Sequence, residues 1–556
     1  MNTPNIVDFF PHDEVRDAQA TILDFIQNST KRIVAVEAPT GVGKSPIAIA
    51  FCRWIAACNE RRDDSIAPNM NKEVHPGSYV LTPNKILQQQ YCDRYDEFLY
   101  NLKGRSNYSC HCATNCDEGK NKLGMVDDDK KSEHPCINDC AYTNAKTEFI
   151  NSMYGTTNFQ YFLTERKYVG ELGRRSGLVI DEAHCIEQTL MGFVSVDFSK
   201  ASVFNVLDVS VPDTKNIWNV IAWLDEDYLP AVDVKLAEYD VTLANAKMIN
   251  DTKLFLKTQQ SINALRYKKK SVDDILDEFM HDPKAACKKW VIDQNDERMA
   301  MKPLDISKFC NEYLFSCGDK VLIMSATLGA GNPKTFFRNL GLDMDDIDYL
   351  QVDCPFPAEN RVVYAFDDVS MAKKNAPRCY DYMVDAVNTI INLYDGEKGI
   401  IHTHSYQIQD IIRERVKSDR ILTHDRTNKD DILQYHMTTS KPTVLVSPSM
   451  AEGVDLYDDL SRFQIVCKVP YPYLGDAQVN AKKAQDDLWY AWLTSVTLIQ
   501  ALGRSIRSME DWAETFIVDA SFNTFRGYNR RLFPKWINFN KGSLKELKEA
   551  LEELNA

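Results

Sequence analysis

Short runs of apolar, mostly β-branched residues recur along the chain, and each leads into a polar or glycine-containing turn. Seven of these runs are RIVAVEAPTG, SYVLTPN, GLVIDEAH, KVLIMSATL, KGIIHTHS, TVLVSPSMAEG and ETFIVDAS. Such runs are typical of strands buried on both faces of a parallel sheet. Helix-compatible stretches such as PIAIAFCRWIAACNE lie between several of them. The pattern therefore predicts an α/β protein built from repeated βα units.

The seven runs form two groups. Four precede about residue 330 and three follow about residue 395, and a chain of 556 residues is too long for a single core, so we expect two α/β domains. The interval from about 196 to 310 lacks the strand-then-turn pattern and contains segments such as SVDDILDEFM. We therefore predict a mainly helical insertion there.

A glycine-containing turn follows the first apolar run in the stretch APTGVGKS, and a helical pattern comes next. Gly41 and Gly43 would let backbone N–H groups close around phosphate oxygens. Lys44 would meet the β and γ phosphates, and the Ser45 hydroxyl would reach Mg²⁺. Ala38 stands where the general phosphate-binding pattern has its first glycine. The flanking strand and helix support a nucleotide phosphate site despite that departure.

Two acids follow a second apolar run in LVIDEAH. Asp181 would hold Mg²⁺ through water, and Glu182 would polarise the water that attacks the γ-phosphate. Acids at a strand end are also found as solvated turn residues, but the phosphate motif upstream favours the catalytic interpretation. His184 by itself fits a packed or capping histidine better than a base.

Three further stretches carry polar residues next to predicted strands or helices. They are SAT after KVLIM, EGVD after TVLVSPSMA, and QALGRSIR, and they supply Ser325, Thr327, Glu452, Gly453, Asp455, Gln500, Arg504 and Arg507. The two arginines are spaced i, i+3, so a helix would aim both at one point, as stabilisation of a transferring phosphate requires. Taken alone, they would fit a solvated basic face.

Charge and cysteine content refine this picture. A net charge of -15 argues against a protein that coats nucleic acid by global attraction, although a local basic channel remains compatible with it. The N-terminal stretch lacks the basic start and apolar run of a signal peptide, so we expect a soluble intracellular protein. Five of the 15 cysteines lie between positions 110 and 140. In a reducing compartment, such a cluster more often holds a metal than forms disulfides.

The ordered set APTGVGKS, DEAH, SAT and QALGRSIR resembles a superfamily 2 helicase. The cysteine-rich segment after LKGRSNYSC, together with CAYTNAK and CPFPAENR, narrows the resemblance to the XPD/DinG-type iron-sulfur helicases, in the compact DinG-like form of bacteria and phages. The resemblance covers nearly the whole chain, because the motifs occur in the family's order.

This resemblance implies two RecA-like motor domains with ATP between them, and iron-sulfur and arch insertions in the first. The expected activity is ATP-dependent 5′ to 3′ translocation on single-stranded DNA and unwinding of duplex DNA. The expected partners are single-stranded and forked DNA, and no membrane contact is expected. We expect the protein to be a monomer in the cytoplasm. The implied boundaries are 1–103, 151–195 and 311–340 for domain 1, 104–150 for the iron-sulfur domain, 196–310 for the arch and 341–556 for domain 2.

The resemblance also assigns roles to individual residues. It assigns adenine binding to Arg16 and Gln19, phosphate and Mg²⁺ binding to Thr40, Gly41, Gly43, Lys44 and Ser45, and catalysis to Asp181 and Glu182, with Asp181 also binding Mg²⁺. It assigns the coupling of hydrolysis to DNA to Ser325 and Thr327, a place at the interdomain cleft to Glu452, Gly453 and Asp455, and catalysis from the second domain to Gln500, Arg504 and Arg507. It assigns contacts with the DNA strand to Thr82, Pro83, Gln88 and the residues from Thr403 to Tyr406.

A 4Fe-4S cluster takes four thiolates, so one of the five clustered cysteines is surplus. Cys110 and Cys140 stand in the family's sequence contexts, and Cys136 shares a helical face with Cys140. For the fourth ligand we choose Cys116 over Cys112, because a one-residue gap makes it hard for Cys110 and Cys112 to reach adjacent corners. Zinc is the rival metal, since spacing alone does not separate the two.

The leading hypothesis is therefore a DNA helicase that uses ATP, Mg²⁺ and a 4Fe-4S cluster. The alternative is a nucleic-acid-stimulated ATPase that acts as a remodelling or redox-sensing module without separating strands. No separate nuclease domain is evident in the sequence.

Overall fold

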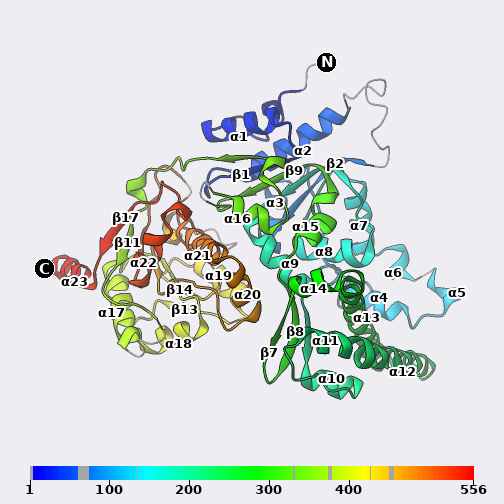
Figure 1. Ribbon diagram of the computed structural model, residues 1–556. Coiled ribbons are helices and arrows are strands. Elements are labelled where there is room, and N and C mark those ends of the chain that lie inside the picture. Colours follow the sequence, from blue (N-terminus) through cyan, green and yellow to red (C-terminus); the bar gives the residue numbers. More distant parts are fainter. Residues whose placement is uncertain are drawn as a thin grey trace.

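The computed structural model describes residues 4–60, 74–132, 134–329, 332–372, 378–425, 427–449, 456–506 and 508–556. Two α/β domains, a cysteine-containing segment and an elongated helical lobe are visible in Figure 1. Four residues named above as site candidates, Glu452, Gly453, Asp455 and Arg507, lie outside the described residues.

A seven-stranded parallel sheet forms the first domain. Its strand order is β10 (Ile347–Gln351), β1 (Ile33–Glu37), β9 (Gly318–Ser325), β5 (Arg175–Ile180), β2 (His75–Thr82), β4 (Tyr154–Asn158) and β3 (Tyr100–Asn101). Every residue of β1 and β5 is buried, as the continuous apolar runs predict. The pairing of β10 with β1 extends this sheet past residue 340, where the sequence analysis ended the first domain.

Helices cover both faces of this sheet. They are α1 (Asp17–Asn28), α2 (Lys44–Glu60), α3 (Lys85–Tyr95), α7 (Ala141–Asn151), α8 (Phe159–Thr164), α9 (Ile186–Val194), α15 (Ser307–Tyr313) and α16 (Lys334–Asn339). One buried cluster packs α1, α2 and α3 against one face, and a larger cluster packs α7, α8 and α9 against the other. This is the doubly wound arrangement that the βα pattern predicts.

The second domain contains another seven-stranded parallel sheet. Its order is β13 (Ile421–Thr423), β14 (Val444–Ser447), β12 (Gly399–His402), β15 (Phe463–Val466), β16 (Glu514–Ile517), β11 (Val363–Phe366) and β17 (Phe539–Gly542). The accompanying helices are α17 (Arg378–Leu393), α18 (Tyr406–Arg415), α19 (Lys429–Thr438), α20 (Ala477–Gln485), α21 (Asp487–Leu502), α22 (Ser521–Tyr528) and α23 (Leu544–Asn555). The predicted α/β class with two parallel-sheet domains and insertions is confirmed.

Two segments project from the first domain on the right of Figure 1. The cysteine-containing segment holds the short helices α4 (Cys116–Leu123), α5 (Asp128–Lys131) and α6 (Pro135–Asn138). The helical lobe holds α10 (Lys200–Leu207), α11 (Ile217–Trp223), α12 (Leu229–Met248), α13 (Thr252–His281) and α14 (Pro283–Lys289).

The helical lobe also contains strands that the sequence analysis did not predict. β6 (Val196–Ser199), β8 (Arg298–Pro303) and β7 (Trp290–Gln294) form an antiparallel sheet. In β6, buried Val196 and Phe198 alternate with exposed residues. An alternation of only four residues is too short to stand out from its helical surroundings.

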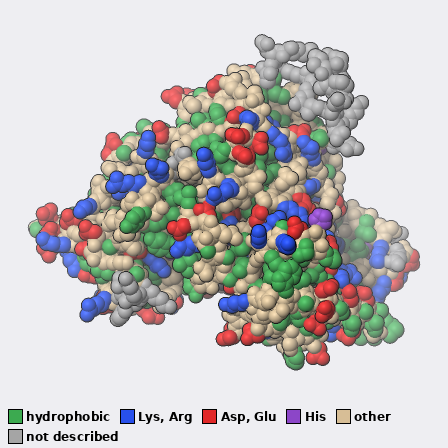
Figure 2. All heavy atoms as spheres, in the orientation of Figure 1, with side chains coloured by type: hydrophobic (Ala, Val, Ile, Leu, Met, Phe, Trp, Pro, Cys, Tyr) green, Lys and Arg blue, Asp and Glu red, His purple; other side chains and the backbone are tan. Residues whose placement is uncertain are grey.

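The visible surface carries charges of both signs. Figure 2 shows Lys and Arg side chains interspersed with Asp and Glu over one face of the molecule. This mixture agrees with the acidic net charge and means that any contact with nucleic acid depends on local groups. Within the part of the chain that the structure describes, no helix has the length and apolar character needed to cross a membrane.

A buried ion pair joins the two domains. Glu187 of α9 binds the Lys482 ammonium of α20, and both side chains are less than a tenth exposed. The indole Nε1 of Trp489 in α21 also donates to both carboxylate oxygens of Glu187, at 2.9 and 3.0 Å. Because charges taken out of water must be compensated locally, these three groups depend on one another and hold α9 against α20 and α21.

We expect Lys482→Met to destabilise the protein by about 3 kcal/mol, because it leaves the Glu187 carboxylate buried without its cation. The double variant Lys482→Met with Glu187→Gln should lose much less, since a neutral amide still accepts from Trp489. Urea-unfolding midpoints would measure both variants. Equal losses in the single and double variants would contradict this account.

Candidate active site

The loop between β1 and α2 has a backbone shape that requires glycine at two positions. Gly41 and Gly43 adopt φ angles of +84° and +89°, in the left-handed region that disfavours other residues. A Cβ at Gly43 would also lie 2.4 Å from Nε2 of Gln19. The loop therefore combines a turn and a close side-chain approach that only glycine permits.

Arg16 and Gln19 hold this loop from the start of α1. Nε2 of Gln19 donates to the carbonyl oxygens of Val42, at 3.1 Å, and Gly43, at 3.3 Å. Nη1 of Arg16 donates to the carbonyl oxygen of Gly41 at 3.2 Å. The two residues that the family resemblance assigns to adenine thus contact the phosphate loop and also line the cleft beside it.

The two acids of LVIDEAH lie directly after β5, facing the phosphate loop. Nζ of Lys44 is 3.9 Å from Oε1 of Glu182 and donates to the carbonyl oxygen of Ala38 at 3.2 Å. Asp181 is 3% exposed, and its Oδ1 accepts from the backbone N–H of Glu182 at 2.9 Å. The structure therefore brings Lys44, Asp181 and Glu182 together, as the motifs predict.

The two carboxylates have different pKa values because their surroundings differ. Burial, together with the adjacent Glu182 charge, raises the pKa of Asp181 to about 6. Burial also acts to raise the pKa of Glu182, but the Lys44 charge and a hydrogen bond from His184 outweigh it and hold that pKa well below its usual range. Glu182 is therefore ionised at neutral pH, as a group that polarises water must be.

Glu182 has an unusual backbone conformation. Its φ and ψ angles are 49° and 48°, a left-handed conformation that costs a non-glycine residue free energy. The turn aims the carboxylate into the cleft, where it lies beside Lys44 and Arg504. Strain at this position fits a residue held for chemistry rather than a solvated turn residue.

A chain of buried polar contacts connects these acids to the second domain. Nδ1 of His184 lies 3.3 Å from Oε2 of Glu182 and 2.8 Å from Oγ of Ser325. Oγ of Ser325 accepts from the backbone N–H of Thr327 at 3.1 Å. His184 is thus a packed residue, as expected, and it links Glu182 to the SAT turn.

The second domain continues this chain through α21. Nε2 of Gln500 donates to Oγ1 of Thr327 at 2.8 Å, and Nη2 of Arg504 donates to Oε1 of Gln500 at 3.2 Å. Separately, Oγ1 of Thr40 donates to the carbonyl oxygen of Gly503 at 2.8 Å. The phosphate loop, the acids and the QALGRSIR segment therefore meet at one interdomain surface.

These groups border one cleft of about 690 Å³. Its lining includes Arg16, Gln19, Thr40, Gly41, Gly43, Lys44, Ser45, Asp181, Glu182 and Arg504. Predicted residues from both domains thus surround a space beside the phosphate loop. The cleft can hold a nucleotide with its phosphates against the N-terminus of α2.

Some residues that the resemblance assigns to the DNA strand are buried in this structure. Gln88 is fully buried, and its Nε2 donates to Oδ1 of Asn101 and to the carbonyl oxygen of Leu102, at 2.5 and 2.9 Å. Thr82 and Thr403 are also fully buried, whereas Tyr406 is exposed. Thr82 and Gln88 thus have structural contacts that the motifs do not reveal.

Sequence reasoning missed Tyr91 of α3. Its hydroxyl donates to Oδ2 of Asp181 at 2.8 Å, and its side chain is 1% exposed. Nothing in the local sequence distinguishes Tyr91 from an ordinary core aromatic, because its partner lies 90 positions further along the chain.

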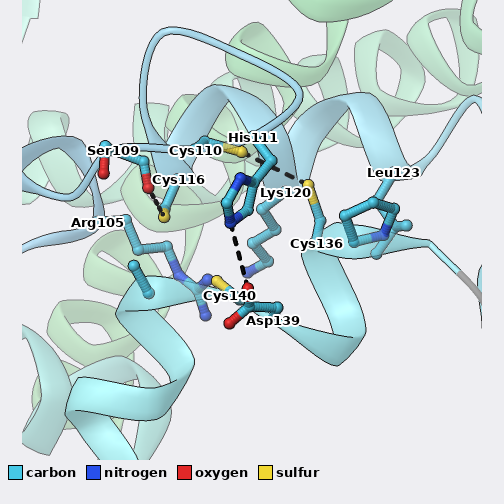
Figure 3. Close-up of a pocket in the computed structure, with 12 residues that line it drawn as sticks. Arg105, Ser109, Cys110, His111, Cys116, Lys120, Leu123, Cys136, Asp139 and Cys140 are labelled. Atoms are coloured by element: carbon cyan, nitrogen blue, oxygen red, sulfur yellow. Dashed lines mark hydrogen bonds and ion pairs between the residues drawn. The ribbon is translucent and has the colours of Figure 1, made fainter.

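The four cysteines chosen as metal ligands line one pocket. Figure 3 shows Cys110, Cys116, Cys136 and Cys140 around it, together with Arg105 and Lys120. Sγ atoms of Cys110 and Cys136 are 3.6 Å apart. Cys140 precedes α7, and although burial acts to raise its pKa, hydrogen bonds from Thr143, Cys116 and Tyr142 lower it overall.

The fifth cysteine also lies close to this group. The thiols of Cys110, Cys112 and Cys136 lie within 4.8 Å of one another, so the one-residue gap does not keep Cys112 away from Cys110. However, Cys112 does not line the pocket that contains Cys116 and Cys140. The pocket favours Cys116 as the fourth ligand, whereas the thiol distances alone favour Cys112.

The packing around the thiols fits a bound cluster. A Cβ at Gly119 would lie 2.4 Å from Sγ of Cys110 and 3.1 Å from Sγ of Cys136, so a side chain there would displace the thiols. All five cysteines are free thiols. Thiolates suit a 4Fe-4S cluster or zinc, and Arg105 and Lys120 would offset part of their negative charge.

Comparisons with known proteins agree with this fold and site. The DEAD/DEAH box helicase family matches residues 16–197, and the helicase C-terminal domain family matches residues 389–540. The ATP-dependent DNA helicase DinG of Photobacterium profundum is 24% identical over 247 residues, which cover 41% of this chain and 35% of that protein. The match thus spans about a third of that relative.

Two further proteins match over most of their length. A probable ATP-dependent helicase of Methanocaldococcus jannaschii is 22% identical, and the match covers 93% of each chain. A solved XPD helicase structure has a TM-score of 0.63 at 16% identity, covering 96% of this chain and 100% of that chain. At 16% identity, the similarity to the XPD structure shows a shared fold.

The two parallel-sheet domains, the cleft between them and the two matching families define a superfamily 2 helicase. ATP, Mg²⁺ and nucleic acid are the ligands that this class implies. Within this class, the chain is similar to the XPD/DinG-type helicases in sequence motifs and fold.

We expect Gly43→Ala to weaken ATP binding at least about tenfold, since a strained left-handed residue costs about 1–3 kcal/mol, and the new methyl group displaces Gln19. Isothermal titration calorimetry with a non-hydrolysable ATP analogue would measure this loss. Gly192→Ala in α9 is the matched control, because a methyl group added there would meet no atom within 4 Å beyond the adjoining backbone of its own helix. Unchanged affinity in Gly43→Ala would contradict the requirement for glycine.

Proposed function

We propose that this protein is an ATP-dependent DNA helicase that moves 5′ to 3′ along single-stranded DNA and unwinds duplex DNA. The observation that carries the proposal is the chain of polar contacts from Glu182 through His184, Ser325 and Thr327 to Gln500. It joins the catalytic acids of one domain to the other domain, so a change at the nucleotide alters how the domains meet.

Both domains supply residues for ATP hydrolysis. Lys44 and the N-terminus of α2 bind the β and γ phosphates, and ionised Glu182 accepts hydrogen bonds from the attacking water and orients it. Arg504 approaches from the second domain and stabilises the charge on the transferring phosphate. Bound Mg²⁺, held by Ser45 and Asp181, would neutralise phosphate charge. Hydrolysis therefore requires the closed arrangement, and release of products permits opening.

DNA specificity and polarity in this proposal rest on the XPD/DinG-type relationship and on the helicase activity named for the DinG relative. A strand held by both domains would move when the cleft opens and closes. We further propose that Cys110, Cys116, Cys136 and Cys140 hold a 4Fe-4S cluster, which supplies a covalent cross-link within the segment when bound. The short helices α4 and α6 would then be fixed against one another.

A strand-displacement assay tests the proposed function. We expect ATP-dependent unwinding of a duplex with a 5′ single-stranded tail and none with a 3′ tail. Glu182→Gln should still bind ATP but should not turn it over, because the amide cannot accept the proton of the attacking water. DNA-stimulated hydrolysis without unwinding of either substrate would favour the remodelling ATPase, and unwinding only from a 3′ tail would reverse the polarity. Wild-type turnover by Glu182→Gln would refute its catalytic role.

Iron content tests the proposed ligand set. Anaerobically purified wild-type protein should be brown, and Cys116→Ser should lose most of its iron, whereas Cys112→Ser should retain it. Cys287→Ser, a half-buried cysteine in α14, is the control for thiol loss elsewhere. Metal analysis and visible absorption provide the measurements. Iron loss in Cys112→Ser but not in Cys116→Ser would make Cys112 the fourth ligand, and a colourless protein with one zinc would exclude the iron-sulfur cluster.

A further inference from the structure

The hydroxyl of Tyr91 meets Asp181, one of the two residues that are proposed to hold Mg²⁺. It donates to Oδ2 of Asp181 at 2.8 Å. A single buried hydroxyl group therefore connects helix α3 with the acid at the end of β5.

The carboxylate of Asp181 is held at both oxygens. Oδ1 accepts from the backbone N–H of Glu182 at 2.9 Å, and Oδ2 accepts from Tyr91. The backbone N–H of Asp181 itself donates to the carbonyl oxygen of Leu81 at 3.0 Å. These contacts fix the rotation of the carboxylate as well as its position, and Tyr91 supplies the only one of them that comes from a side chain.

Tyr91 is itself held in a fixed position. Its ring belongs to the buried cluster between α2, α3 and the sheet, with the ring of Tyr95 centred 6.4 Å away. One turn earlier, Gln88 anchors α3 by donating to Asn101 and Leu102 and accepting from Nδ2 of Asn158 at 2.9 Å. Helix α3 therefore presents the Tyr91 hydroxyl at a set point of the site.

We propose that Tyr91 is a positioning residue for the magnesium-binding carboxylate of Asp181. This inference rests on the proposed function, because it assigns Tyr91 to the same nucleotide site. Mg²⁺ requires nearly ideal octahedral geometry, so the angle at which its ligands are held affects its affinity. Groups that orient a metal ligand through a hydrogen bond commonly change metal affinity by about 10- to 100-fold.

Tyr91→Phe removes the hydroxyl and keeps the ring that packs in the core. We expect the Mg²⁺ concentration that half-saturates binding of a fluorescent methylanthraniloyl-ADP to rise about tenfold in this variant. Affinity for the same nucleotide in EDTA should stay unchanged, since Tyr91 lies on the metal side of the site. Fluorescence titrations of the full-length protein, with and without Mg²⁺, measure both quantities and do not depend on turnover.

Tyr79→Phe is the matched control. Tyr79 is a buried tyrosine of β2 in the same domain, and its hydroxyl donates to the carbonyl oxygen of Gly173 at 3.0 Å, so its loss reports the effect of removing any buried hydroxyl. The control should lose thermal stability to a similar degree while its Mg²⁺ dependence stays that of the wild type.

Three results would overturn the inference. An unchanged Mg²⁺ half-saturation in Tyr91→Phe would show that Asp181 is positioned without the hydroxyl. An equal loss of nucleotide affinity with Mg²⁺ and with EDTA would show a general structural defect. If Mg²⁺ had no effect on nucleotide binding by the wild-type protein, both the proposed function and this inference would be refuted. The titration of the wild-type protein alone distinguishes this result from the first one.

Discussion

Parallel pairing of β1, β9, β5 and β2 is the constraint on which the site depends. Neighbouring parallel strands run in the same direction, so their carboxyl ends meet at one edge of the sheet. The pairing places Glu37 opposite Ser325, and the turns that follow β1, β9 and β5 carry the phosphate loop, the SAT residues and the two acids. Residues almost 300 positions apart become neighbours because the register of the paired strands places them side by side. A shift in that register would separate Lys44 from Glu182.

The second domain completes the site from the end of a single helix. Gln500 lies in the last turn of α21 and contacts Thr327, and Arg504 follows just after the helix ends and lines the cleft. The hydrogen bond from Gln500 to Thr327 is buried, and breaking it would leave polar groups unpaired unless water enters. Opening of the cleft therefore requires water to replace protein contacts. That exchange would give an open arrangement an energy different from that of the arrangement seen here, and a bound nucleotide would shift the balance between them.

The sequence predicts those parts of the structure that depend on the pattern of neighbouring residues. Buried strands, the glycines of the phosphate loop and the acids after β5 all show in short windows of residues. The order of strands within each sheet does not, and the small sheet of β6, β7 and β8 was missed because its alternation is brief. The role of Tyr91 was missed, and Gln88 was assigned to the DNA strand, for another reason. Each forms hydrogen bonds to groups distant in sequence, and a tyrosine or glutamine in a helix gives no local sign of such a partner.

Helix α3 connects the nucleotide site with the cysteine-containing segment. Gln88 holds Asn101 and Leu102, from which the chain leaves the sheet, and Nζ of Lys85 donates to Oδ1 of Asn107, just before Cys110. About one turn further along the same helix, Tyr91 contacts Asp181. The helix has 11 residues, so it joins the contacts at its first turn to the contact with the carboxylate without any intervening loop. The two sites that the sequence presents as separate motifs therefore share a structural support.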